Sequence, residues 1–191
     1  MEGRAAGALY VQYIRGVRPS EILGIFPEHI SLPEDDIDPA QGLCIVSLGV
    51  KHGTKNNRPQ FMLLHENDPR DNRAIHILRL AKKTSLPGLP IFAVSYQQWN
   101  NLFRRASALL KLKEAATAHS PRPGWATDQI LAKMAFTEIQ ERGRWSSPQS
   151  LRIYLDAVGA AAQRARSESA AWSHLSLQVE NDFWRFVPVW W

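Results

Sequence analysis

The sequence predicts an α+β fold that is mainly helical and contains a small antiparallel β-sheet. The apolar, β-branched segment LCIVSLGV and the apolar segment PQFMLLHE flank the turn-forming stretch KHGTKNNR, as expected of a β-hairpin. Most of the remaining chain shows apolar residues at helical spacing between serine, proline and glycine boundaries. With 191 residues and 45% hydrophobic content, we expect one domain with a sizeable core.

The N-terminal half is expected to open with a helix over residues 3–15, followed by a second helix that starts at Pro19. Arg18 would stand at the start of that second helix, beside free backbone N–H groups that could help to hold an anion, although a surface arginine near a turn fits equally. After an acidic loop over residues 32–42, the two strands should cover residues 43–50 and 59–66. A core-packing helix is expected from about residue 70 to 83.

The C-terminal half is expected to be entirely helical. Ser95 should cap a long helix over residues 96–116 that buries Leu109 and Leu110. A helix over residues 125–135 follows, and then a short helix capped by Thr137 and ended by Gly143. The last predicted helix runs over residues 147–166.

Charge is distributed unevenly along the chain, whose net charge is +5. Residues 21–38 hold six acids and no lysine or arginine, whereas residues 101–166 hold eleven lysines and arginines against five acids. Such a basic region favours a polyanionic partner, and a solvated helix face would explain it as well. The single cysteine, Cys44, excludes a disulfide framework and a zinc cluster, so we expect a buried thiol in a reducing compartment.

The N-terminus has arginines at positions 4 and 15 and only a short apolar run between them, so it lacks the pattern of a signal peptide. No stretch approaches 18 consecutive apolar residues. We therefore expect no membrane partner and an intracellular protein, located in the nucleus of a eukaryote or in the cytoplasm and nucleoid of a bacterium.

Four residues with complementary chemistry follow one another in the C-terminal half. His119 and Arg122 stand three residues apart, Trp145 follows Arg122 by 23 residues, and Tyr154 follows Trp145 by nine. They offer a proton carrier, a cation, an indole N–H donor and a phenol, which together could attack a phosphodiester. Each alone has a structural explanation, and Tyr154 could simply be a partly buried core tyrosine.

The motif extends upstream to Gly16-x-Arg18-x-x-Glu21. The stretch EIQERGRWSSPQSLRIYL contains both Trp145 and Tyr154. In residue order, in spacing and in the basic hairpin between Arg18 and His119, the chain resembles the catalytic domain of the tyrosine recombinases, the phage-integrase type. The resemblance implies the catalytic-domain fold of that family. It also implies an enzyme that recombines or integrates double-stranded DNA at specific sites and associates with itself on DNA.

The resemblance assigns a role to each residue. Tyr154 would attack the scissile phosphate to form a 3′-phosphotyrosine, and His119 would assist the proton transfer. Arg18 and Arg122 would clamp the non-bridging oxygens. Trp145 would donate its indole N–H or pack against the helix of the nucleophile.

A hairpin lysine would protonate the leaving 5′-oxygen; Lys55 suits that position, and Lys51 is an alternative. Because the arginines supply the electrostatic stabilisation, no metal, cofactor or small-molecule substrate is expected. Residues 1–166 would form the catalytic domain, with the family's N-terminal core-binding domain absent. The aromatic tail over residues 167–191 would dock on a neighbouring subunit or on the domain's own core.

Two other hypotheses fit the same sequence. The chain could be a catalytically inactive, DNA-binding remnant of a mobile-element integrase, with the same fold. It could also be an unrelated helical interaction domain, in which case Arg18, His119, Arg122, Trp145 and Tyr154 would lie scattered in space.

Overall fold

The computed structural model describes residues 2–36, 39–49, 59–112, 115–153 and 155. Its α-helices are α1 (Glu2–Arg15), α2 (Pro19–Leu23), α3 (Pro69–Lys83), α4 (Tyr96–Leu109), α5 (Pro121–Leu131), α6 (Phe136–Arg142) and α7 (Pro148–Arg152). Its strands are β1 (Ile30–Ser31), β2 (Leu43–Leu48) and β3 (Gln60–His65). The predicted mainly helical α+β fold is confirmed. No helix in these ranges is long and apolar enough to cross a bilayer.

The strands form one antiparallel sheet in the order β1, β2, β3. Cys44 is paired with Leu64 and Leu48 with Gln60, so the predicted hairpin is confirmed. The sequence did not reveal β1, because two residues are too few to show an alternating pattern. Side chains alternate along β3, where Leu64 is buried and Leu63 is 49% exposed.

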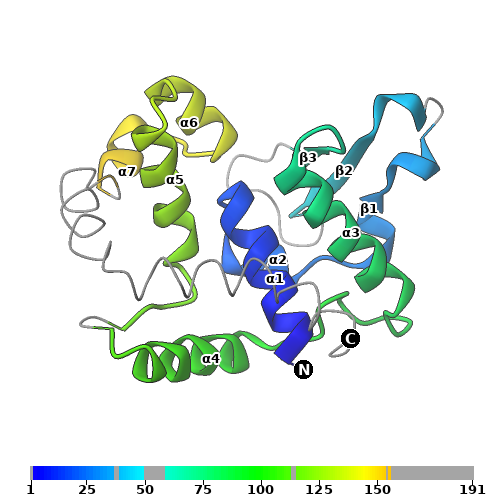
Figure 1. Cartoon of the computed structure of the whole chain (residues 1–191), viewed down its shortest axis with the longest axis horizontal. Coiled ribbons are helices and arrows are strands. Elements are labelled where there is room, and N and C mark those ends of the chain that lie inside the picture. Colours follow the sequence, from blue (N-terminus) through cyan, green and yellow to red (C-terminus); the bar gives the residue numbers. More distant parts are fainter. Residues whose placement is uncertain (1, 37–38, 50–58, 113–114, 154, 156–191) are drawn as a thin grey trace.

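Two groups of buried side chains hold the helices together. The main core lies between the sheet, α1, α3 and α4, and it includes Val11, Ile22, Val46, Leu64, Ile77, Phe92 and Trp99. The small cluster lies between α5, α6 and α7 and consists of Trp125, Ala126, Ile139, Trp145 and Leu151. Figure 1 shows α5, α6 and α7 grouped on one side of α1 and the sheet with α3 on the other side. α1 therefore lies between the sheet with α3 and the group formed by α5, α6 and α7.

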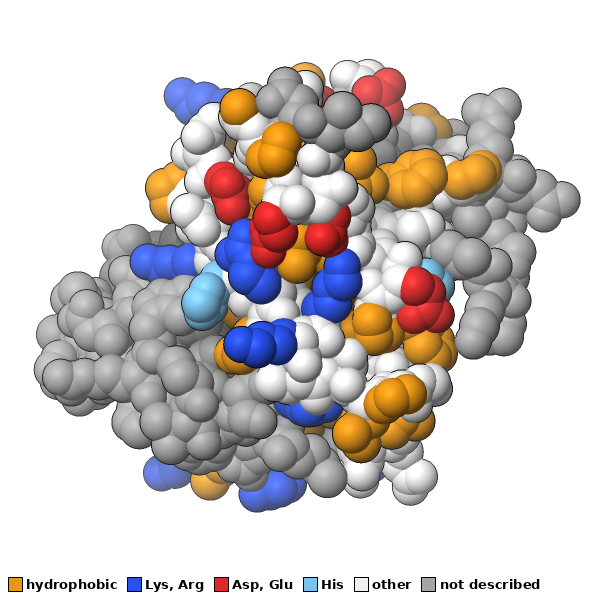
Figure 2. Space-filling view, turned by 90° about the vertical axis from the view of Figure 1, so that its right-hand side faces the viewer, with side chains coloured by type: hydrophobic (Ala, Val, Ile, Leu, Met, Phe, Trp, Pro, Cys, Tyr) orange, Lys and Arg blue, Asp and Glu red, His pale blue; other side chains and the backbone are white. Residues whose placement is uncertain are grey.

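The side of the molecule formed by α3 and the neighbouring acidic loop carries acidic and basic side chains next to one another (Figure 2). Arg79 on α3 bonds to Glu34 at 2.7 Å and to Glu66 at 3.4 Å, and Lys82 bonds to Asp35 at 2.8 Å. Two of the six acids that bias this part of the chain, Glu34 and Asp35, are thus paired with basic residues of α3. Exposed pairs of this kind contribute little stability, about 0–1 kcal/mol each.

Several predicted helix boundaries and two predicted buried positions in the C-terminal half were wrong. α4 ends at Leu109, and not at residue 116, because the chain turns at Lys111 (φ 50°) and folds back so that the Ala116 N–H donates to Ser107. Leu109 and Leu110 are therefore 80% and 46% exposed. The helix expected over residues 125–135 is α5, which begins already at Pro121; proline tolerates the first turn of a helix because its missing N–H is not needed there.

The N-cap of α6 is Ala135, so the prediction that Thr137 caps this helix was wrong, whereas Gly143 does follow its last residue. α7 begins at Pro148, one residue after the predicted start, and the Oγ of its N-cap Ser147 accepts the N–H of Ser150 at 3.2 Å. α7 ends at Arg152, and residues 156–166 of the predicted helix lie outside the part of the chain that the structure describes.

Candidate active site

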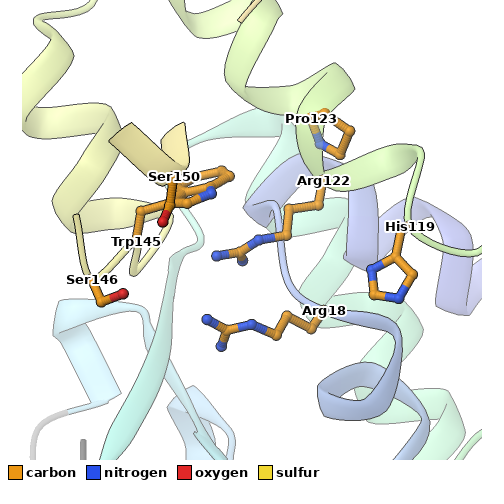
Figure 3. A pocket seen from close by; sticks show the side chains of 7 residues that line it. All are labelled: Arg18, His119, Arg122, Pro123, Trp145, Ser146 and Ser150. Carbon is orange, nitrogen blue, oxygen red and sulfur yellow. The ribbon is translucent and has the colours of Figure 1, made fainter. Parts of the chain in front are cut away.

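A pocket of about 210 Å³ opens where α2, α5 and the turn between α6 and α7 meet. Figure 3 shows that the side chains of Arg18 and Arg122 extend toward the turn that carries Trp145 and Ser146, and that His119 lies on the opposite side. The residues that line the pocket are Arg18, His119, Arg122, Pro123, Trp145, Ser146 and Ser150. Four of the six predicted site residues are thus brought together from three distant stretches of the chain.

Arg122 lies in the first turn of α5 and is only 6% exposed. Its Nη1 donates to the carbonyl of Gly16 and its Nη2 to the carbonyl of Gly143, both at 2.5 Å. The guanidinium also lies 4.0 Å from the centre of the Trp145 ring, a favourable cation–π arrangement. Its contacts therefore fix the Arg122 guanidinium in place and join the start of α2 to the end of α6.

Arg18 is the residue immediately before α2, as predicted. Its backbone N–H and its Nη1 both donate to the carboxylate of Glu21, each at 2.6 Å, and its Nη2 donates to the carbonyl of Arg144 at 3.4 Å. The Arg18 backbone N–H is therefore not available to a ligand, because the carboxylate one turn later accepts it. The guanidinium remains 32% exposed on the pocket side.

Glu21 lies between two arginines and is only 8% exposed. Arg144 donates to its Oε2 at 2.8 Å. Burial alone would raise the pKa of Glu21, but the Arg144 charge, the Arg18 N–H and the Arg18 and Arg122 charges together hold that pKa below its ordinary value. Burial lowers the pKa of Arg144, and the Glu21 charge opposes this effect. Glu21 is thus an ionised carboxylate that organises the cations of the site.

Trp145 forms the wall opposite His119 and is 8% exposed. Its ring is stacked on Trp125, with ring centres 6.2 Å apart and an interplanar angle of 7°. A Cβ at Gly143 would overlap the Trp145 ring, so this position requires glycine. Trp145 thus packs within the small cluster, which also contains Leu151 of α7, and its ring supports the Arg122 guanidinium.

His119 lies in the turn that precedes α5 and is exposed. Its carbonyl accepts the N–H of Arg122 at 3.1 Å, so its backbone starts the turn that positions Arg122. Its imidazole lines the pocket beside the two arginines (Figure 3). An exposed imidazole next to a pocket can exchange protons with solvent or with a bound ligand.

Lys55, its alternative Lys51, and Tyr154 lie outside the residues that the structure describes. Ser150 in α7 lines the pocket four residues before Tyr154, and Leu155 packs against the small cluster.

Sequence reasoning missed several residues around the pocket. Ser146 and Ser150 line it, and only their closeness in sequence to Trp145 and to the α7 cap could have indicated this. No sequence pattern indicated Arg144, because its contact with Glu21 joins residues more than one hundred positions apart. Glu21 did belong to the upstream motif, but no role was assigned to it.

The arrangement is suited to a tetrahedral oxyanion. Two guanidinium groups can donate paired hydrogen bonds to its oxygens, the geometry in which arginine exceeds lysine. The indole of Trp145, the hydroxyls of Ser146 and Ser150 and the imidazole of His119 add further polar groups around the same space.

Comparison with solved structures gives the same fold at low sequence identity. The XerH site-specific recombinase bound to its difH substrate matches with a TM-score of 0.60 and 16% identity, over 84% of this chain and 45% of XerH. The XerA recombinase matches with a TM-score of 0.57 and 15% identity, over 88% and 64% of the two chains. The chain has the fold of the tyrosine recombinases.

The Tn1549 transposon integrase in complex with a circular intermediate DNA shares the tyrosine recombinase fold as well, with a TM-score of 0.52 and 15% identity over 83% of this chain and 58% of the integrase. The chain spans between 45% and 64% of the lengths of these three proteins. No protein-family model and no curated protein matches the sequence. The predicted fold is confirmed, and the scattered arrangement expected of an unrelated helical domain is not found for Arg18, His119, Arg122 and Trp145.

Proposed function

We propose that this chain breaks and rejoins strands of double-stranded DNA, in site-specific recombination or integration, through a 3′-phosphotyrosine formed by Tyr154. The observation that carries the proposal is the convergence of Arg18, His119, Arg122 and Trp145 on one pocket. XerH and the Tn1549 integrase, which share the fold, are described as bound to DNA.

In this proposal the two arginines hold the scissile phosphate. Arg122 is fixed by two carbonyls and a tryptophan ring, so its charge is already oriented before a ligand enters. Pre-oriented donors stabilise the additional negative charge of a phosphorane without the cost of reorganising during the reaction. Arg18 reaches the same space from α2 and, being more exposed, can also attract the phosphate from solution.

Three side chains exchange protons in this proposal. The Tyr154 phenol, with an ordinary pKa near 10, must lose its proton in order to attack. His119 lines the pocket and can accept that proton. A lysine of the hairpin loop, Lys55 or alternatively Lys51, would return a proton to the leaving 5′-oxygen.

The proposal assigns residues 1–166 to the catalytic domain and residues 167–191 to a tail that docks on protein. It also includes self-association on DNA and an intracellular site of action, where double-stranded DNA is found. No metal is required in this scheme, because the arginines supply the positive charge.

The test is covalent trapping on DNA. The protein is incubated with a nicked duplex from which the cleaved fragment diffuses away, the mixture is denatured, and protein–DNA adducts are resolved by gel. We expect an adduct that Tyr154→Phe abolishes and that Tyr96→Phe, at an exposed position on α4, leaves unchanged. Arg122→Lys should reduce the adduct about 100-fold, because lysine cannot bridge both carbonyls and present a paired donor.

An adduct that persists in Tyr154→Phe would refute the assignment of the nucleophile. Salt-sensitive DNA binding that Arg18→Ala weakens, without any adduct, would instead identify an inactive DNA-binding protein.

A further inference from the structure

We propose that Arg144 is a positioning residue: by binding one oxygen of Glu21 it restricts that carboxylate to a single side-chain bond with Arg18 and keeps the Arg18 guanidinium facing the pocket. Neither the sequence motif nor the likeness to recombinases assigns a role to this arginine. The inference rests on the proposed function only in taking the ligand of the pocket to be a DNA phosphate.

The backbone of Arg144 is the first observation. Its φ is 56°, in the left-handed region that glycine occupies freely and a long side chain rarely does. The residue directly follows Gly143, the end of α6, and directly precedes Trp145. An unfavourable backbone conformation at such a turn persists when the side chain makes a compensating contact.

That contact is buried and connects distant parts of the chain. The Arg144 side chain is 12% exposed and that of Glu21 is 8% exposed, and Nη2 lies 2.8 Å from Oε2. Breaking a buried pair leaves an uncompensated charge, which is far more costly than breaking a surface pair. The Arg144 Nε is buried without a hydrogen-bond partner among the described residues, so the carboxylate is the principal partner of its guanidinium.

The two oxygens of the Glu21 carboxylate accept hydrogen bonds from different donors, which explains how Arg144 acts on Arg18. Oε2 accepts from Arg144 Nη2 and from the Arg18 backbone N–H, while Oε1 accepts from Arg18 Nη1. A carboxylate with both oxygens available binds arginine in a paired fork. Arg144 occupies the second oxygen, and Arg18 Nη2 instead bonds at 3.4 Å to the Arg144 carbonyl. Arg18 therefore makes a single side-chain bond to Glu21, and its Nη2, which makes only a 3.4 Å bond to a carbonyl, remains able to bind a ligand.

Arg144 itself does not line the pocket of Arg18 and Arg122. Its side chain instead borders a neighbouring cavity between β3, α5 and α6, whose lining includes Arg15, Phe61 and Trp125. It therefore acts through Glu21 and not by touching the ligand, which separates it from Arg18 and Arg122.

The experiment measures binding of the full chain to a fluorescent 30-base-pair duplex by anisotropy, with inorganic phosphate as competitor, and the thermal melting of each variant. Glycine fits the backbone at position 144, so we expect Arg144→Gly to remain folded but to bind the duplex about tenfold more weakly. Arg144→Lys should recover most of the affinity, because it restores a cation for Glu21. The control is Arg142→Ala, at an exposed arginine paired with Glu138, which should bind like the parent.

Parent-like binding by Arg144→Gly, or an equal loss in Arg142→Ala, would overturn the inference. If the glycine variant does not fold, Arg144→Asn, which also tolerates this backbone, must show the same loss. Arg18→Ala separates the two proposals. If it weakens binding while Arg144→Gly does not, only the role of Arg144 fails; if Arg18→Ala binds like the parent, the proposed use of the pocket for DNA phosphate fails as well.

Discussion

The main core and the small cluster are stabilised in different ways. The main core is built largely from aliphatic side chains of the sheet and of α1, α3 and α4 that are fully or almost fully buried. The small cluster has few buried residues, and two of them are tryptophans, Trp125 and Trp145, stacked on each other. Around it, Arg122 and Arg144 form bonds to Gly16 and Glu21 beside α1 and α2.

This difference indicates which contacts hold the residues of the pocket in place. A small apolar cluster excludes too little water to fix three short helices by itself. Buried polar contacts to the N-terminal region supply the missing constraint, and these contacts are made by the residues that shape the pocket. Loss of a site contact should therefore loosen the small cluster, whereas loss of a main-core side chain should loosen the whole molecule.

The largest expected effect comes from truncating one tryptophan in each region. Trp99→Ala and Trp145→Ala each remove a large buried ring and should cost about 3–5 kcal/mol. Hydrogen exchange should show faster exchange throughout the molecule for Trp99→Ala, but mainly in α5, α6 and α7 for Trp145→Ala. Equal patterns in the two variants would show that the two regions unfold as one unit.

A second comparison uses two glycines with positive φ. Gly16 (φ 56°) faces Trp125, and a Cβ there would lie 2.5 Å from the ring, whereas Gly88 (φ 73°) has open space around it. Gly88→Ala should lower the free energy of unfolding by about 1 kcal/mol, because it introduces only backbone strain. Gly16→Ala should cost about 1–3 kcal/mol more, because α1 and α5 must separate. Urea unfolding measures both, and similar losses would argue against a tight α1–α5 junction.

The third prediction concerns pH. Because the folded-state pKa of Glu21 is held below its ordinary value, its ionised form stabilises the fold above that ordinary value. This contribution should disappear as the pH falls through the depressed folded-state pKa. The stability difference between the parent and Glu21→Gln should thus shrink upon acidification from neutral pH, as measured by urea unfolding at each pH. Glu138→Gln, at an exposed pair, should show almost no such change.

The smallest effect is expected at Cys44 in the main core. Burial raises the pKa of its thiol to about 12, so almost no thiolate exists at neutral pH. A thiol reagent should therefore react only when the sheet opens, at a rate that rises with urea. Rapid reaction of the native protein would show that β2 opens without global unfolding.

Local patterns were sufficient to predict the main elements of the fold. Short-range chemistry predicted the hairpin of β2 and β3, the Ser95 cap, the start of α7 near Ser147 and the end of α6 at Gly143, and the structure has them. The length of α4 could not be predicted, because it depends on how residues beyond Lys111 fold back onto Ser107.

The site was predictable only in part. His119, Arg122 and Trp145 could be found because their spacing resembles a known family motif, and the structure places them with Arg18 around one pocket. The Glu21–Arg144 pair could not be found, because no local pattern indicates a contact between residues 123 positions apart. The roles of Tyr154 and Lys55 stay predictions.

The two carbonyls bound by Arg122 also set an order of events in folding. Gly16 belongs to the N-terminal part of the chain and Gly143 to the turn after α6, so Arg122 can satisfy both only after the late helices have docked against α1. A chain that has folded its main core but not its small cluster has no assembled pocket. Under the proposed function, such an intermediate would hold the two arginines apart and could not hold a DNA phosphate between them.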